Sequence, residues 1–372
     1  MNILFLTSYS TGQGHKSITE ALCRQIERLA PETNITIVDG FASGNWAARA
    51  SGQVYNMLAV YFPYLWKLIY PLTDVFPHFI NRVTARCIGK ELLKRVRETN
   101  PDLIVSVHAA FVGASILLLR KRKLSIPVVS VVADLDNVAA LWADRDAYAV
   151  VCPTEEAKNK MLAVGMPEDK LPVLGFPIRE SFTKKDAANP HGDTENLTAL
   201  LISGSQGSRR IQKIVRVLLD NHTCRMRIIT GKNFILKKAL ELRYASRLGH
   251  EIEIMGFIKE IDQYMCQADF LIARASPNVV MEAVALNKPV VITDFFYGQE
   301  KKNPAFIENH HLGVVCTDIQ RLPSVIAGLS ADDGAGWRAI QKSQAMYDKT
   351  DAAARAAAFF LKIGETQKDH ES

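Results

Sequence analysis

Residues 1–29 read MNILFLTSYSTGQGHKSITEALCRQIERL and combine a short apolar run, a glycine loop and an amphipathic segment. Ile3–Thr7 predicts a buried strand, and Lys16–Leu29 has its apolar residues at helical spacing. A strand that enters a helix through a glycine loop is typical of a doubly wound α/β domain. The start of such a helix offers N–H groups to an anion or an oxygen-rich ligand, so this stretch predicts a ligand-binding domain.

This first glycine loop matches neither common nucleotide signature. It lacks the third glycine of the dinucleotide-binding fingerprint and the Gly-Lys-Ser/Thr ending of a phosphate-binding P-loop. His15 follows Gly14 directly and can act as a general base near neutral pH. A helix-capping or solvent-facing histidine is the alternative, and this motif alone slightly favours it.

Strand and helix patterns alternate along the chain and restart after a polar segment. Further strands are expected at Ile35–Val38, Leu103–Val107, Val128–Ala133, Ala147–Cys152 and Val173–Leu174, and then at Leu197–Ile202, Arg225–Thr230, Ile252–Met255, Phe270–Ala273, Val290–Thr293 and Val314–Cys316. We expect two doubly wound parallel-sheet domains at residues 1–182 and 197–345, with a linker at 183–196 and a C-terminal helix and polar tail at 346–372. Such domain pairs bind ligands in the cleft that they face.

Composition excludes several classes of protein. The chain has 372 residues, which at roughly 150 residues per domain indicates two domains or three. Apolar residues at 48% and charged residues at 23% exclude a disordered, collagen-like or coiled-coil chain. A net charge of +6 suits an anionic membrane face or a phosphate-bearing substrate and does not indicate nucleic acid. The six cysteines form no CxxC pair, so neither a disulfide framework nor a zinc site is expected.

The predicted second domain opens with a small-residue loop of its own. The strand ending at Ile202 leads into Ser203, Gly204, Ser205 and Gln206, and a helix is predicted to follow. Small residues at the start of a helix suit a diphosphate, whereas an ordinary strand-to-helix turn is the alternative. Two such loops are more informative than either alone.

Polar residues also follow later strands of that domain. Arg274–Asn278 opens a helix that carries Glu282, and Gly298–Glu300 with Asn303 follows the next strand. A helix start can face a phosphate, and a carboxylate can accept hydrogen bonds from neighbouring hydroxyls. Taken singly, Glu282 could be a solvated helix residue and the Gln299–Asn303 segment a polar loop.

In this order the motifs resemble those of the monogalactosyldiacylglycerol synthase and processive diacylglycerol β-glucosyltransferase family, over roughly residues 1–330. The resemblance implies an inverting GT-B enzyme, related to the N-acetylglucosaminyltransferase of peptidoglycan lipid synthesis, that uses a UDP-sugar as co-substrate and no other cofactor. It implies catalytic roles for His15 and Asp134, with His108 as a reserve base. It implies donor-binding roles for Gly14, Ser203, Gly204, Ser205, Gln206, Gly231, Asn233, Phe257, Arg274, Ser276, Pro277, Asn278, Glu282, Gly298, Gln299, Glu300 and Asn303.

Within that set the resemblance assigns uracil to Phe257, ribose to Glu282 and the hexose to Gln299 with Glu300. Two departures stand out. Arg274–Asn278 replaces a glycine-rich turn, and Tyr297 replaces a proline before Gly298. The sugar stays open, because one or two hydroxyl contacts discriminate between hexoses.

An aromatic stretch, YNMLAVYFPYLWKLIY at residues 55–70, carries only one charge, Lys67. Aromatic and aliphatic residues with few cations are typical of a segment in the headgroup region, and a buried helix hairpin is the alternative. The resemblance places Pro63–Tyr70 near the acceptor. The expected acceptor and membrane residues are Tyr55, Phe62, Leu65, Trp66, Tyr70 and His108.

We therefore expect a hexosyltransferase that glycosylates a diacylglycerol-type lipid at an anionic membrane surface, peripherally on the cytoplasmic face of the cell membrane. A UDP-sugar 2-epimerase, a glycosyltransferase with a soluble acceptor and a non-catalytic UDP-sugar-binding protein are the alternatives. We expect no bound metal at Asp134–Asp136 and no nucleic acid partner, and the oligomeric state stays open.

Overall fold

The structure is a computed structural model that describes residues 1–9, 13–183, 197–203, 208–347 and 350–371. The chain divides into two compact units. Unit 1 comprises Met1–Arg179, Tyr297–Lys301 and Lys349–Ser372, and unit 2 comprises Glu180–Phe296 and Lys302–Asp348. The short segment Tyr297–Lys301 therefore belongs to unit 1, although the chain on both sides of it belongs to unit 2.

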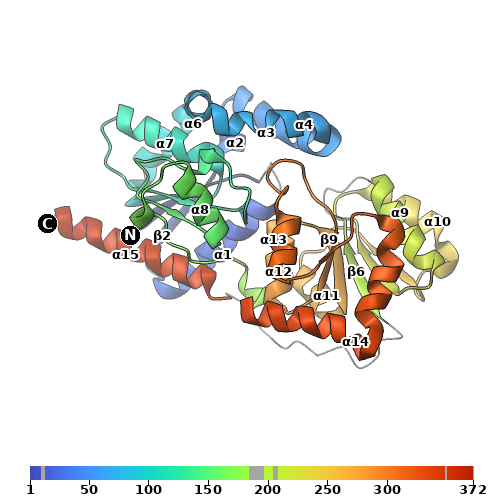
Figure 1. The fold of residues 1–372 in the computed structure, drawn as a ribbon. Coiled ribbons are helices and arrows are strands. Elements are labelled where there is room, and N and C mark those ends of the chain that lie inside the picture. The colour runs from blue at the N-terminus through green and yellow to red at the C-terminus, as the bar shows by residue number, and fades with distance from the viewer. Residues whose placement is uncertain (10–12, 184–196, 204–207, 348–349, 372) are drawn as a thin grey trace. The chain divides into compact units, whose positions relative to one another are not determined.

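Unit 1 is built on a parallel sheet whose described strands run in the order β2-β1-β3-β4-β5 (Figure 1). The strands are β1 (Asn2–Thr7), β2 (Asn34–Asp39), β3 (Leu103–Ser106), β4 (Val128–Val131) and β5 (Ala149–Val151). Thr7 lies opposite Asp39, and Leu6 lies opposite Ser106. Since all strands point the same way, the residues that follow them meet at one edge of the sheet.

Helices cover both faces of this sheet. They are α1 (Gln13–Leu29), α2 (Gly40–Ser43), α3 (Trp46–Tyr61), α4 (Pro63–Ile69), α5 (Leu72–Val75), α6 (Pro77–Thr99), α7 (Ala109–Lys121), α8 (Glu155–Ala163) and α15 (Ala352–Glu371). Figure 1 shows α6 and α7 side by side on one face, and α1 with α15 on the other. Gly89 permits the close approach of α6 to α7, because a Cβ atom there would lie 2.9 Å from Leu118 Cδ2.

Unit 2 holds a second parallel sheet, with the described strands in the order β11-β10-β9-β6-β7-β8. The strands are β6 (Thr198–Ile202), β7 (Arg225–Ile229), β8 (Ile252–Met255), β9 (Phe270–Arg274), β10 (Val290–Asp294) and β11 (Val314–Val315). The helices are α9 (Ser208–Asp220), α10 (Phe234–Arg243), α11 (Ile261–Gln267), α12 (Pro277–Ala285), α13 (Asn303–Asn309) and α14 (Leu322–Tyr347), which is interrupted at residues 331–334. Trp337 of α14 stacks on Phe270 at 4.8 Å and anchors that helix to the core.

The predicted fold class, two doubly wound parallel α/β sheets, is confirmed. One predicted strand is nearly absent, because Val173 forms only an isolated bridge with Cys152. Pro172 beside it has no N–H to give a ladder, which limits the pairing. Within the described residues, no helix combines the length and the apolar character needed to cross a bilayer.

Candidate active site

Two histidine rings meet at the carboxyl edge of the unit 1 sheet. His15 lies in the first turn of α1 after β1, and His108 is the N-cap of α7 after β3, with ring centroids 4.6 Å apart. His108 Nδ1 accepts a hydrogen bond from the Ala110 N–H at 3.2 Å, so the ring hydrogen of the neutral form is on Nε2. The neighbouring positions of β1 and β3 bring these rings together.

Packing around the rings keeps both histidines neutral. Burial lowers the pKa of His15 to about 4, and a hydrogen bond with the backbone of Val107 opposes the shift only partly. Burial, and then the charge of a protonated His15, hold the pKa of His108 well below its usual value. His15 Nδ1 is shielded from solvent and has no hydrogen-bond partner within the described parts of the chain. The neutral ring is the form that can accept a proton.

Asp134 lies at the same edge, after β4. Its Oδ2 accepts a hydrogen bond from Trp142 Nε1 at 3.0 Å, and the Trp142 ring also lies 6.4 Å from the His15 ring. Burial raises the pKa of Asp134 to about 7, the hydrogen bond from Trp142 opposes this, and the negative charge of Glu300 adds to it. Asp134 therefore changes charge near neutral pH.

The segment Tyr297–Lys301 reaches this edge within unit 1. Gln299 Oε1 accepts a hydrogen bond from Trp66 Nε1 at 3.3 Å, and the Gly298 carbonyl accepts one from Asn137 Nδ2 at 2.5 Å. Glu300 is 3% exposed and close enough to influence Asp134. The structure thus brings three predicted donor residues, Gly298, Gln299 and Glu300, to the predicted catalytic pair.

Gly14 lies in the first turn of α1 in unit 1, and the remaining described donor candidates lie in unit 2. Asn303 starts α13 and donates from Nδ2 to the Ala275 carbonyl at 2.8 Å. Ser203 follows β6, and its buried Oγ has no partner among residues that the structure describes. Gly204, Ser205 and Gln206 lie outside the described residues, as does Gly12. Their predicted roles stay predictions.

Helix α12 presents its first turn after β9. Ser276 is the N-cap but makes no side-chain capping hydrogen bond, and Pro277 occupies the first turn. The first N–H groups of a helix can bind an anion, so the start of α12 at Pro277–Asn278 stays the predicted place for a phosphate. Glu282, one turn further on, is 6% exposed, and the Arg274 guanidinium lies 3.6 Å from the Phe296 ring centroid.

Two further donor candidates differ in exposure. Phe257 is 62% exposed after β8, and the uracil role expected for its backbone stays a prediction. Asn233 caps α10, since its Oδ1 accepts from the Leu236 N–H at 3.0 Å, and its Nδ2 donates to Ser208 Oγ at 3.0 Å. Gly231 beside it has a positive φ of 58°, which favours glycine.

Trp66 and Tyr70 of the aromatic stretch face inward. Trp66 is only 6% exposed, so its side chain cannot enter a lipid surface, which corrects the membrane contact expected for it. Tyr70 is half-buried and its hydroxyl donates to the Asn137 carbonyl at 3.2 Å. Trp66 is buried because one face of its helix packs against the 297–301 segment. The side chain of Tyr55 lies outside the described residues.

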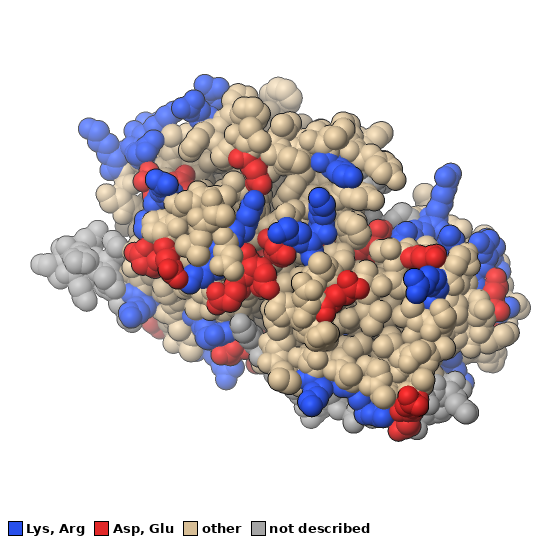
Figure 2. Space-filling view, in the orientation of Figure 1, with Lys and Arg blue, Asp and Glu red and all other residues tan. Residues whose placement is uncertain are grey.

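The same region also carries exposed apolar side chains, which together we call the apolar surface. It consists of Phe62, Tyr64, Leu65, Leu68, Leu72, Val75, Phe76 and Phe79, each between 46% and 74% exposed. Figure 2 shows that the face over α3 and α4 carries few charges, whereas Lys and Arg gather at the end of unit 1 where α6 and α7 lie. Groups of exposed apolar residues are typical of surfaces that contact a partner or a membrane.

Two family models match the chain in succession. The monogalactosyldiacylglycerol (MGDG) synthase model matches residues 15–178. The glycosyltransferase family 28 C-terminal domain model matches residues 198–356. The chain belongs to the MGDG synthase family. It is a UDP-sugar-dependent hexosyltransferase, of the type that transfers a sugar to diacylglycerol.

Plant enzymes are among the relatives of this MGDG synthase family member. The probable monogalactosyldiacylglycerol synthase 2, chloroplastic, of Oryza sativa subsp. japonica is 28% identical over 340 residues, which is 85% of this chain and 71% of the rice protein. The similarity runs through both units, so the family assignment does not depend on one motif.

Solved structures share the fold at low sequence identity. MurG of Acinetobacter baumannii has a TM-score of 0.60 at 13% identity and covers 97% of this chain and 99% of its own. The UDP-GlcNAc 2-epimerase of Neisseria meningitidis has a TM-score of 0.61 at 15% identity and covers 97% and 100%. Because both classes fit equally well, the fold does not separate a transferase from an epimerase, whereas the family models do.

Sequence reasoning missed two residues of this family member's candidate site. Trp142, to which the sequence assigned no role, hydrogen-bonds Asp134. Asn137 was not considered, and it holds the Gly298 carbonyl from 161 positions away in the sequence. The only nearby sequence feature that indicated a site was the turn at Asp134–Asp136. Contacts between residues far apart in the sequence leave no periodic pattern that could predict them.

Proposed function

We propose that the protein transfers a hexose from a UDP-sugar to the hydroxyl of a diacylglycerol-type lipid, with inversion to a β-linkage. The observation that carries this proposal is neutral His15, whose shielded Nδ1 has no partner among the described residues, at the edge that also holds Asp134 and Glu300. In a direct displacement the acceptor hydroxyl loses its proton as its oxygen attacks the anomeric carbon, so a positioned base is required.

Each chemical role has a residue in the proposal. His15 accepts the hydroxyl proton, and ionised Asp134 stabilises the positive charge that His15 then carries. In unit 2, the first turn of α12 offers N–H groups that stabilise the charge developing on the UDP leaving group. Glu282 binds the ribose hydroxyls, and Gln299 with Glu300 orients the hexose.

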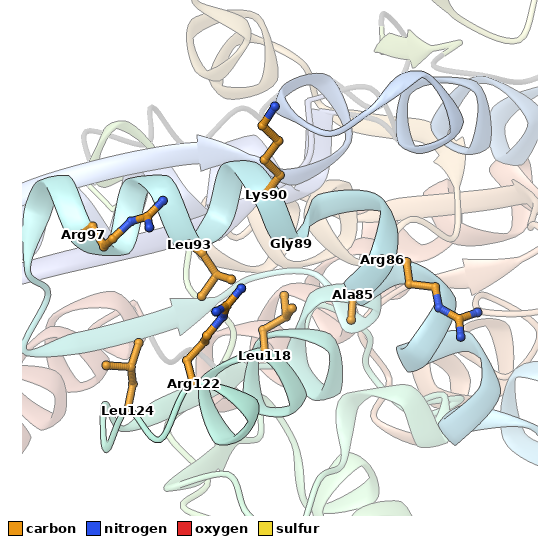
Figure 3. A pocket seen from close by; sticks show the side chains of 9 residues that line it. All are labelled: Ala85, Arg86, Gly89, Lys90, Leu93, Arg97, Leu118, Arg122 and Leu124. Atoms are coloured by element: carbon orange, nitrogen blue, oxygen red, sulfur yellow. The ribbon is translucent and has the colours of Figure 1, made fainter.

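Unit 1 carries exposed cations that could attract an anionic lipid surface. Figure 3 shows a pocket of about 550 Å³ between α6 and α7, where Arg122 reaches between Leu93 and Leu118. Three further cations line it from α6: Arg86, Lys90 and Arg97, which recur at helical spacing on one side of that helix.

None of these four cations forms an ion pair with another described residue, while Glu91 and Glu98 of α6 pair with Arg95 instead. Unpaired cations near a bilayer contribute about 1 kcal/mol each to the binding of anionic lipid. We call the pocket between α6 and α7, with its four cations, the basic groove. The basic groove and the apolar surface together support a peripheral attachment of the enzyme to an anionic membrane.

The test is transfer from a panel of radiolabelled UDP-hexoses into vesicles of diacylglycerol and an anionic phospholipid, measured as organic-extractable product. We expect labelled glycolipid from one or more donors, and the anomeric configuration of the product reports inversion. Turnover into water-soluble product alone would overturn the lipid acceptor.

The base assignment has its own test. His15→Ala should abolish transfer while binding of UDP stays within about twofold of wild type, because UDP contacts lie in unit 2. Titration calorimetry with UDP provides the control. Near-normal turnover of the variant would show that His15 is not the base.

A further inference from the structure

The segment Tyr297–Lys301 rests on helix α4 through its backbone. A Cβ atom on Gly298 would lie 2.9 Å from Tyr70 Cγ and 3.0 Å from Trp66 Nε1. Gly298 also has a positive φ of 108°, a conformation that side-chain-bearing residues rarely adopt. The loop backbone at Gly298 is therefore in direct contact with the inward face of α4. A side chain at this position would collide with that face, and the positive φ also favours glycine.

Tyr297 makes the second contact with this helix. Its ring stacks on Tyr64 with centroids 5.8 Å apart, and the Lys67 ammonium lies 5.6 Å from its centroid. Tyr297 stands where the family pattern has a proline. Tyr64 and Lys67 both belong to α4, so this departure adds contacts between the loop and the helix.

The third contact fixes the orientation of an amide. Trp66 Nε1 carries a hydrogen and can only donate, so the end of the Gln299 side chain that faces it at 3.3 Å must be the carbonyl oxygen. The amide nitrogen of Gln299 is then at the other end of the group, and it acts only as a donor. Trp66 is 6% exposed and is held in place by its packing, with its ring 5.9 Å from that of Tyr70.

We propose that Trp66 is a positioning residue for the donor sugar: it holds the Gln299 amide so that the N–H groups of Gln299 donate to a hexose hydroxyl. The proposal rests on the proposed function, in which Gln299 binds the hexose. Trp66 itself does not touch the donor. A group that acts through Gln299 affects the hexose part of the donor and leaves the UDP part unchanged.

The experiment compares the binding of UDP-hexose and of UDP by titration calorimetry in the absence of acceptor. Trp66→Phe keeps the aromatic ring but removes the N–H. We expect the Kd of the UDP-hexose used in transfer to rise roughly threefold to tenfold, as for the loss of one hydrogen bond, with the Kd of UDP unchanged. Trp46→Phe, at an exposed position of α3, is the matched control and should change neither.

A double-mutant cycle separates positioning from a general structural effect. If Trp66 acts through Gln299, adding Trp66→Phe to Gln299→Ala should produce no further loss of UDP-hexose affinity. Additive losses, an equal weakening of UDP binding, or an unchanged Kd for UDP-hexose would each overturn the proposal. Because no acceptor is present, failure of the lipid acceptor in the transfer assay would leave this result interpretable.

Discussion

His15 and Asp134 owe their protonation states to the same physical cause, since packing keeps water from both side chains. Burial disfavours a charged form, which lowers the pKa of a histidine and raises that of an aspartate. Trp142 lies against both groups, 3.0 Å from Asp134 by its hydrogen bond and 6.4 Å from His15 between ring centroids. One neutral base and one carboxyl group that titrates near neutrality thus lie at one edge.

We predict that kcat/KM for transfer falls as the pH decreases through about 7. The pKa of Asp134 is raised to about 7, so its ionised form is lost below that pH, whereas His15 with a pKa of about 4 stays neutral. Asp134→Asn should be slower and should lack this acidic limb. A pH profile that keeps the limb in Asp134→Asn would assign it to another group.

Helix α10 and the 297–301 segment both contain candidate donor residues, and a single polar side chain helps to hold each of them in place. In unit 2, Asn233 begins α10 with a capping hydrogen bond to Leu236 and links that helix to Ser208 at the start of α9. In unit 1, Asn137 links the turn after β4 to the Gly298 carbonyl. The predicted donor role of Asn233 therefore has a structural alternative.

Asn233→Ala should destabilise the protein by about 1 kcal/mol, the usual loss for an N-cap. Thermal unfolding should show a decrease in Tm of a few degrees, roughly 2–4 °C. Asn233→Ser keeps a capping oxygen and is the matched control, because serine caps helices about as well as asparagine. A weaker UDP-hexose affinity with unchanged Tm in Asn233→Ala would instead indicate direct donor binding.

At the scale of the whole molecule, the residues proposed for the lipid and those proposed for the nucleotide belong mainly to different units. Unit 1 holds the apolar surface, the basic groove and the histidine edge, and unit 2 holds the α12 start and Glu282. The net charge of +6 is consistent with attraction to anionic lipid over distances of about 10 Å, the Debye length at 0.1 M salt.

We predict that Leu68→Ser weakens binding to anionic vesicles about tenfold, because Leu68 is 73% exposed within the apolar surface and burying a leucine contributes about 1.5–3 kcal/mol. Leu242→Ser, at a 70% exposed leucine of α10 in unit 2, is the matched control and should bind as wild type. Vesicle co-sedimentation measures both, and binding should fall with added salt. Equal losses in the two variants would contradict a specific surface on unit 1.

Most strands were predicted because apolar runs and helical spacing are local signals. Ile3–Thr7 and Arg225–Thr230 lie within one residue of the strands observed. Trp66 was misjudged as a membrane contact because an aromatic stretch has the same composition whether it faces lipid or protein.

Residue order and periodicity were enough to predict two parallel-sheet domains, the strand-to-helix loops and the family motifs, because each depends on neighbours within a few positions. Only the tertiary structure decided that Tyr297–Lys301 packs with unit 1, that Trp66 points inward to Gln299, and that Asp134 titrates near pH 7. These properties depend on contacts between residues up to 233 positions apart and on the water that packing excludes, and neither is encoded in any short stretch of the chain.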